Sequence, residues 1–310
     1  MGNSYQNSLK LGWGHLETQA QPANTSSVDL NRLAVRVSRS ENLPVLPQAV
    51  SSVLKLADDP NAGPRDLERV IERDPAITAK ILRAANSAYY GSPNVPNIGR
   101  AIAFLGMNAV RSLVVSVAFQ GMTANRGTSQ RFDNLEYWRH SLAVATGARI
   151  LGRLRIPMRA EELYCAGMMH DIGYLILDRF MGTDLDTALE QSLNDKTPIH
   201  EQEEFLYGFT HADVGGLLAE KWGLTPMIQA AVKYHHNPQE DGNYFETTCF
   251  IAAANVLAHQ AGFTNNTVGI TWELEPHVVK AVGIPLEQFD AIRDVMVQEV
   301  LKAQETFKIQ

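Results

Sequence analysis

The sequence predicts an all-α protein of two helical lobes, and two observations support this prediction. From Ser27 onward nearly every segment begins at a polar capping residue, continues with apolar residues at three- and four-residue steps, and ends at glycine or proline. Strand signals are nearly absent. With 310 residues, 45% of them hydrophobic, the chain can bury a core in one large or two moderate domains.

Residues 1–26 are rich in Asn, Ser, Gln and Thr and show no sustained period, which predicts a flexible tail. They show neither a secretion signal nor the pattern for N-terminal myristoylation. No apolar run approaches the ~20 residues that a membrane-spanning helix needs. We therefore expect a cytoplasmic protein that is not associated with a membrane.

Cysteine usage and charge narrow the class further. Cys165 and Cys249 lie in apolar stretches and not in CxxC pairs, which predicts buried free thiols. The net charge of −7 is uneven: residues 1–130 carry 13 Lys/Arg and 9 Asp/Glu, whereas residues 131–310 carry 14 and 25. Neither half has the basic stripe with interleaved aromatic residues that a nucleic-acid surface needs, so we expect no nucleic-acid partner.

The first helices are marked by proline. A helix from Val28 to Arg39 is followed by two prolines, and Pro47 is well placed as the first residue of the next helix. Asp74-Pro75, an aspartate cap followed by proline, predicts the start of a helix with an apolar face that ends at Gly91.

Two more helices, Ile98 to Leu105 and Met107 to Gln120, are expected to pivot at Gly106. The loop from Thr123 to Gln130 contains glycine and small polar residues and predicts a boundary near residue 130. The expected division is a tail over residues 1–26, an N-terminal lobe over 27–130, a second lobe over 131–262, and a C-terminal extension over 263–310 that ends in a helix.

Histidines dominate the chemistry of the second lobe. Five of the nine fall in four helical segments after residue 130, and in each segment one lies on the apolar face, as His140 does with Ala143, Val144, Gly147, Leu151 and Leu154. A single buried histidine is explained most simply as a core residue with a hydrogen-bond partner. Four such helices together favour one shared interior site, because buried imidazole nitrogens need partners.

Two of these segments carry adjacent polar pairs at helix ends. His170-Asp171 precedes Gly173, which can end a helix, and His235-His236 precedes Asn237-Pro238. Neighbouring side chains diverge by ~100° on a helix, so end positions are where both members can serve one site. The candidate metal ligands are His140, His170, Asp171, His211, His235 and His236.

Other polar features have simpler explanations. Glu201 to Glu204 predicts a solvated helix face, and Tyr89-Tyr90 is expected to pack where the lobes meet. Arg83, Arg100 and Arg111 are expected to form caps and ion pairs near that seam, with binding of an anionic nucleotide as the alternative.

Two sets of motifs carry a family resemblance that covers roughly residues 40–255. The second half resembles the HD superfamily of metal-dependent phosphohydrolases in WRHS (Trp138 to Ser141), MMHDIG (Met168 to Gly173), GFTHADVG (Gly208 to Gly215) and YHH (Tyr234 to His236). The first half resembles HDOD domains, bacterial signalling modules, in LPVLPQAVSSVLKLADDP (from Leu43), DPAITAKILRAANSAYYG (from Asp74) and IGRAIAFLGMNAVRSLVV (from Ile98). The resemblance implies an HD-like helical bundle for the second lobe and a regulatory role, generally without a demonstrated reaction.

Comparison with the related HD-GYP phosphodiesterases, which open cyclic di-GMP, implies three departures. The final metal-ligating aspartate of HD enzymes aligns with Asn255, and a neutral amide is a far poorer ligand for a divalent cation. Tyr174 replaces a phosphate-facing lysine, and Asn237 replaces a glutamate. Because two divalent ions bring +4 and Asp171 is the one anionic ligand left, the site is expected to hold one divalent transition-metal ion (Fe, Mn or Zn) or none.

Three functions follow from these observations. The first is a non-catalytic signal-transduction module that binds a protein partner or a small nucleotide ligand across the lobe interface. The alternative is a metal-dependent phosphohydrolase of cyclic dinucleotides or nucleotides, whose ion is held by His170, Asp171 and other histidines. The third is a scaffold without a ligand. The sequence indicates neither the signal nor the oligomeric state.

Overall fold

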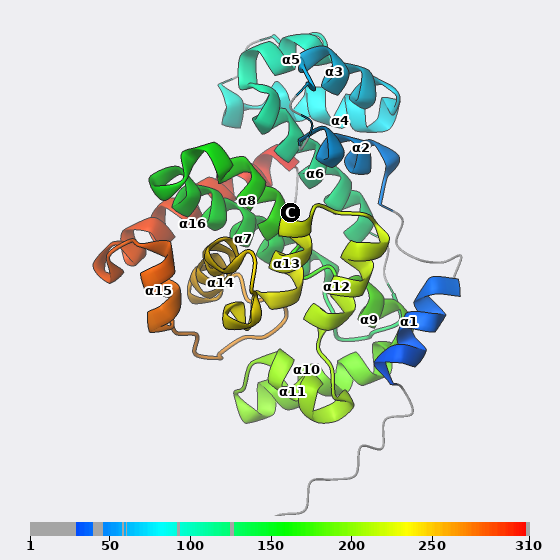
Figure 1. Ribbon diagram of the computed structural model, residues 1–310, viewed down its shortest axis with the longest axis vertical. Coiled ribbons are helices and arrows are strands. Elements are labelled where there is room, and N and C mark those ends of the chain that lie inside the picture. The colour runs from blue at the N-terminus through cyan, green and yellow to red at the C-terminus, as the bar shows by residue number, and fades with distance from the viewer. Residues whose placement is uncertain are drawn as a thin grey trace, which may run out of the picture.

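The computed structural model describes residues 29–39, 46–57, 59, 61–91, 94–124 and 127–307, and within these ranges it is helical without a strand. The all-α prediction is confirmed. Figure 1 shows a small upper lobe above a larger group of helices. The predicted tail over residues 1–26 lies outside the described residues.

The upper lobe packs four short helices against one long helix. They are α2 (Gln48–Ala57), α3 (Pro64–Glu72), α4 (Pro75–Ala85), α5 (Ile98–Leu105) and the long α6 (Met107–Thr123). As predicted, Asp74 caps α4 by accepting from the backbone N–H groups of Ala76 and Ile77. Gly106, at φ +88°, joins α5 and α6 at the expected pivot. No described helix is by itself long and apolar enough to span a membrane. α5 and α6 together reach that length and apolarity, but the pair is bent by 119°.

The predicted end of α4 at Gly91 is wrong. The helix stops at Ala85, and Gly91, at φ +81°, closes the separate 3₁₀ turn η1 (Ala88–Tyr90). The cause is the side chain of Asn86. Its Nδ2 donates to the carbonyls of Leu82 and Val95, and its Oδ1 accepts from the Val95 N–H, which turns the chain away from the helix axis.

The second lobe is built around α7 (Asn134–Arg155), the longest helix described. Its other helices are α8 (Ala160–Met169), α9 (Tyr174–Phe180), α10 (Gly182–Asp195), α11 (Ile199–Tyr207), α12 (His211–Lys221), α13 (Pro226–Tyr234) and α14 (Phe245–Gln260), and α15 (Pro276–Val282) and α16 (Phe289–Phe307) follow. Short 3₁₀ turns are η2 (Pro157–Arg159), η3 (Pro238–Glu240) and η4 (Leu286–Gln288). α16 returns to the upper lobe, where Thr306 Oγ1 donates to Ser87 Oγ.

The first helix, α1 (Leu30–Arg39), precedes the upper lobe in the chain but contacts the lower one, as Figure 1 shows. Lys221 Nζ on α12 donates to the carbonyl of Val37 at 3.1 Å. The guanidinium of Arg36 lies 5.7 Å from the centre of the Phe180 ring at the end of α9.

Arg149 of α7 is the central polar residue of the interface between the lobes, with 8% of its surface exposed. It donates to the hydroxyl of Tyr89 at 3.0 Å, lies over the ring of Tyr164, and approaches Glu161 to 4.0 Å. The Tyr89 hydroxyl in turn donates to Glu299 of α16 at 3.0 Å. One buried guanidinium therefore links the upper lobe to α7, α8 and α16, with Tyr89 at the seam as expected.

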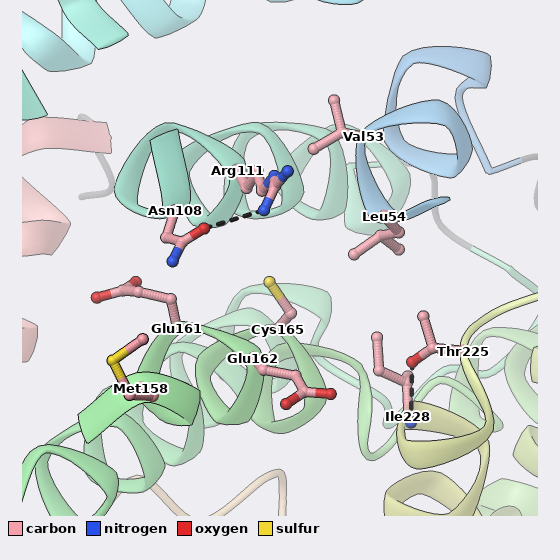
Figure 2. Close-up of a pocket in the computed structure, with 10 residues that line it drawn as sticks. All are labelled: Val53, Leu54, Asn108, Arg111, Met158, Glu161, Glu162, Cys165, Thr225 and Ile228. Atoms are coloured by element: carbon pink, nitrogen blue, oxygen red, sulfur yellow. Dashed lines mark hydrogen bonds between the residues drawn. The ribbon is translucent and has the colours of Figure 1, made fainter. Parts of the chain in front are cut away.

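A pocket of about 200 Å³ lies beside this network, between the lobes. Figure 2 shows Asn108 and Arg111 of α6 on one side and Glu161 and Cys165 of α8 facing them, with Thr225 at the start of α13 nearby. Arg111 donates to Asn108 Oδ1 within its own helix. The pocket is thus walled by helices of both lobes.

The buried position of Arg149 predicts a specific loss of stability. We expect Arg149→Ala to lower the free energy of unfolding by about 3 kcal/mol, because it removes the buried cation that donates to Tyr89 and compensates the charge of Glu161. Arg153 is the matched control: it bonds the same Glu161 at 3.0 Å from the exposed side. Arg153→Ala is expected to cost about 1 kcal/mol or less in urea unfolding. Equal losses for the two variants would contradict this role.

Candidate metal centre

The two predicted pairs do lie at helix ends. His170-Asp171 occupies the turn between α8 and α9, and His235-His236 follows α13. Gly173 ends this turn and precedes α9, and its φ of −60° is one that any residue can adopt. A Cβ at this position would lie 1.8 Å from the carbonyl oxygen of His211. The glycine is needed for space, because it lets the turn of Asp171 approach the start of α12.

All six candidate ligands meet at one point around the carboxylate of Asp171. Its side chain is buried, as are those of four of the histidines, and His236 is partly buried. Four imidazole Nε2 atoms surround it: those of His170, His211 and His235 lie 3.3, 3.1 and 3.3 Å from Oδ1, and that of His140 lies 3.6 Å from Oδ2. His236 Nε2 lies 3.0 Å from His211 Nε2.

Each of these four imidazoles is fixed through its other nitrogen. Nδ1–H groups donate to backbone carbonyls in three cases: His140 to Phe263 at 2.7 Å, His170 to Gly167 at 2.8 Å, and His235 to Val232 at 2.9 Å. The fourth, His211 Nδ1, donates to Glu203 Oε2 at 2.7 Å. A carbonyl can only accept, so Nδ1 carries the proton and Nε2 points at Asp171. Metal-ligating histidines are oriented by outer partners of this kind.

The charges in the centre are set by burial and by two carboxylates. Burial disfavours the imidazolium of His211, but Glu203 and Asp171 outweigh it and raise the pKa of His211 to about 10. Burial lowers the pKa of His140 and of His235 to about 4. Burial alone would raise the pKa of Asp171, yet the neighbouring histidines hold it well below its ordinary value. At neutral pH the centre without a metal ion therefore offers an anionic carboxylate, neutral imidazoles at His140 and His235, and an imidazolium at His211, which must lose a proton before its Nε2 can bind a metal ion.

Glu203 shows where the sequence interpretation was wrong. The sequence predicts a solvated face for Glu201 to Glu204, but Glu203 is fully buried and accepts from both the backbone N–H and the ring of His211. A signal was present in the sequence: Ile199, Glu203 and Tyr207 recur at four-residue steps, and all three are buried. A carboxylate in the middle of an apolar stripe indicates a buried partner.

Further residues that sequence analysis did not single out join the centre. Asn265, beyond the expected end of the second lobe, donates from Nδ2 to Asp171 Oδ2 at 2.6 Å. His259 follows Asn255 by one helical turn, and its ring stacks on that of Trp272 at 3.9 Å and 9°. His200 stacks on His236 at 3.8 Å. The spacing of His259 from Asn255 was the one sequence signal available for these residues.

Two of the three replaced positions lie against this region. Asn255 is 3% exposed, and its Oδ1 has no hydrogen-bond partner among the described residues. The ring of Tyr174 is stacked on His211, with centres 4.2 Å apart and planes at 19°, and it is buried. Tyr174 therefore packs where the resemblance has a lysine that faces phosphate. Asn237 is exposed and lies between the paired histidines and the turn η3, without a side-chain hydrogen bond that caps this turn.

The donor set fits a metal ion. Two groups of ligand atoms lie within 4.8 Å of one another: Asp171, His211, His235 and His236 in one, and His140, His170 and Asp171 in the other. His235 Nε2 has no hydrogen-bond partner among the described residues, although it is buried against this carboxylate. Imidazole and carboxylate donors suit divalent transition metals such as Fe, Mn and Zn. The cluster can hold a metal ion, and its geometry does not select among these metals.

Known proteins share this architecture. Residues 43–238 match the family model of the HDOD domain. An uncharacterised protein from Treponema pallidum is 23% identical over 234 residues, which is 73% of this chain and 44% of the relative. The chain thus spans less than half the length of that curated relative.

Three crystal structures share the fold. An HDOD domain protein with unknown function from Geobacter sulfurreducens has a TM-score of 0.69 and 21% identity over 87% of this chain and 99% of its own. A candidate phosphohydrolase from Shewanella amazonensis gives 0.67 and 22% over 89% and 97%, and a candidate signal transduction protein from Marinobacter aquaeolei gives 0.73 and 22% over 90% and 65%. The sequence resemblance, the fold and the family match agree: this chain belongs to the HDOD domain family.

Proposed function

We propose that this chain is a regulatory signalling module that acts by binding a ligand or partner between its lobes, and that it does not hydrolyse phosphodiesters. The observation that carries the proposal is the charge of the histidine centre. Asp171 is the one carboxylate in either group of candidate ligands. Two divalent ions at such a site would remain largely uncompensated, because imidazoles and the amide of Asn255 are neutral.

Glu203, the other buried carboxylate near the centre, does not add to the charge of the candidate ligands. Glu203 is bonded to His211 Nδ1, on the side of the ring away from Asp171, so it orients a ligand and does not occupy a ligand position. The centre keeps an arrangement of histidines suited to one ion. It lacks the anionic residue that the resemblance to HD enzymes implies at position 255.

The placement of two helices supports a relay between the lobes. α8 starts at the interlobe pocket with Glu161 and ends at His170-Asp171. α13 starts there with Thr225 as its cap and ends at His235-His236. A helix of ten residues is ~15 Å long, so a ligand at one end would contact rigid elements that position the centre at the other. A small ligand or a partner side chain would reach this pocket from the seam.

The absence of hydrolysis is directly testable. We expect no turnover when the full chain is incubated with cyclic di-GMP, ppGpp or nucleoside triphosphates in the presence of Mn²⁺ or Fe²⁺, because the second ion lacks a carboxylate. Products would be followed by chromatography. Steady turnover that disappears in both His170→Ala and Asp171→Ala would overturn the proposal, whereas turnover that survives in these variants would indicate a contaminating enzyme.

Metal-dependent hydrolysis is the second candidate, and the four oriented Nε2 atoms favour it. A divalent ion held by Asp171 and the histidines would supply a water of lowered pKa. His140 and His170 would bind this ion from α7 and from the end of α8, and Glu203 would orient the ring of His211. Metal binding alone does not distinguish this candidate from a non-catalytic module, because such a module can also hold an ion as part of its fold.

Glu203 allows the metal site to be tested apart from any reaction. We expect Glu203→Gln to weaken Zn²⁺ binding on the order of 10- to 100-fold, because His211 loses its anionic partner. The measurement is a competition titration against a chelating dye, with circular dichroism to check the fold. Glu204→Gln is the control, since the next residue on α11 is exposed. If both variants bind Zn²⁺ as the wild type does, Glu203 does not act through a metal ligand.

A further inference from the structure

A separate pocket of about 210 Å³ borders the histidine centre. Its lining includes Asn255, His235 and His236 from the centre. Trp272, from the segment between α14 and α15, forms part of its wall, together with His200 of α11. The pocket shares none of the residues that line the pocket between the lobes.

The charges around this pocket are of one sign. Three glutamates, Glu201, Glu273 and Glu275, line it and are exposed. Among the described residues that line it, none is lysine or arginine. A rim with three carboxylates raises the local concentration of cations and repels phosphate groups. A phosphate ester is therefore a poor fit for the opening that leads to His235 and His236.

The interior supplies a second, independent observation. Asn255 lines the pocket with 3% of its surface exposed, and its Oδ1 has no hydrogen-bond partner among the described residues. A buried acceptor without a donor costs about 1 to 3 kcal/mol, so a ligand with an N–H group would gain by meeting it. Trp272 adds an aromatic surface, and such surfaces attract organic cations. An acceptor, an aromatic wall and a carboxylate rim together are the features that recognise an amine.

We propose that this pocket binds a small organic amine. The ammonium group enters past the three glutamates and donates to Asn255 Oδ1. The methylene groups of the ligand lie against Trp272 and the apolar residues Ala252 and Val256, which also line the pocket. The amide at position 255, which is a poor metal ligand, then has a role of its own as the acceptor for this ligand.

Calorimetric titration of the full chain with 1,4-diaminobutane tests the proposal, with 1,4-butanediol as a neutral probe of the same length. We expect heat of binding for the diamine alone, and weaker binding as salt is added, because exposed carboxylates are screened. The triple variant Glu201→Gln, Glu273→Gln, Glu275→Gln is expected to lower the affinity about tenfold. Asn255→Leu is expected to lower it by a similar factor through the lost acceptor.

A matched variant separates the pocket from the general charge of the protein. Glu72→Gln, Glu287→Gln and Glu305→Gln remove the same three charges at exposed positions that do not line the pocket, and this variant should bind as the wild type does. The proposal fails if the diamine does not bind, if both triple variants lose affinity equally, or if bis(4-nitrophenyl) phosphate binds more tightly than the diamine. None of these results bears on the interlobe pocket, because the two pockets have separate linings.

Discussion

The carboxylate of Asp171 is the group on which the arrangement of the second lobe depends. It lies within 3.1 to 3.6 Å of imidazole nitrogens from four separate parts of the chain, and Asn265 donates to it from the segment after α14. A buried charge is tolerated only when it is paired and hydrogen-bonded, so these five elements must keep their places relative to one another. For the same reason the turn at Gly173 must lie close to α12, and a side chain at this position would push the two apart.

The two pockets place different chemistry at the two ends of α13. Near the seam, Arg111, Glu161 and Glu162 give a lining of mixed charge beside apolar side chains. At the opposite end of this helix, the lining is imidazole, amide and indole inside a carboxylate rim. α13 borders both pockets, so it links them physically without requiring a reaction at the histidines. The single ligand carboxylate and the acidic rim both disfavour phosphate chemistry.

The all-α class, the pivot at Gly106 and the meeting of six candidate ligands could be predicted, because apolar periodicity records which helix faces are buried. Features that depend on contacts between distant parts of the chain could not be predicted. Glu203 looked solvated because its partner His211 lies on another helix, and the end of α4 depends on a side chain that bonds to Val95. Leu154 shares the stripe of His140 but is 56% exposed, because the last turn of α7 extends beyond the packed core.

The link from Tyr89 to Glu299 spans 210 residues of sequence. A ribosome that adds about 5 to 20 residues per second makes the second partner about 10 to 40 s after the first. During that interval the upper lobe exists without α16, and Tyr89 and Ser87 lack the partners that α16 supplies. The seam between the lobes is consequently among the last parts of the protein to be completed during synthesis, and nascent chains expose it to chaperones for longer than any local contact within a lobe.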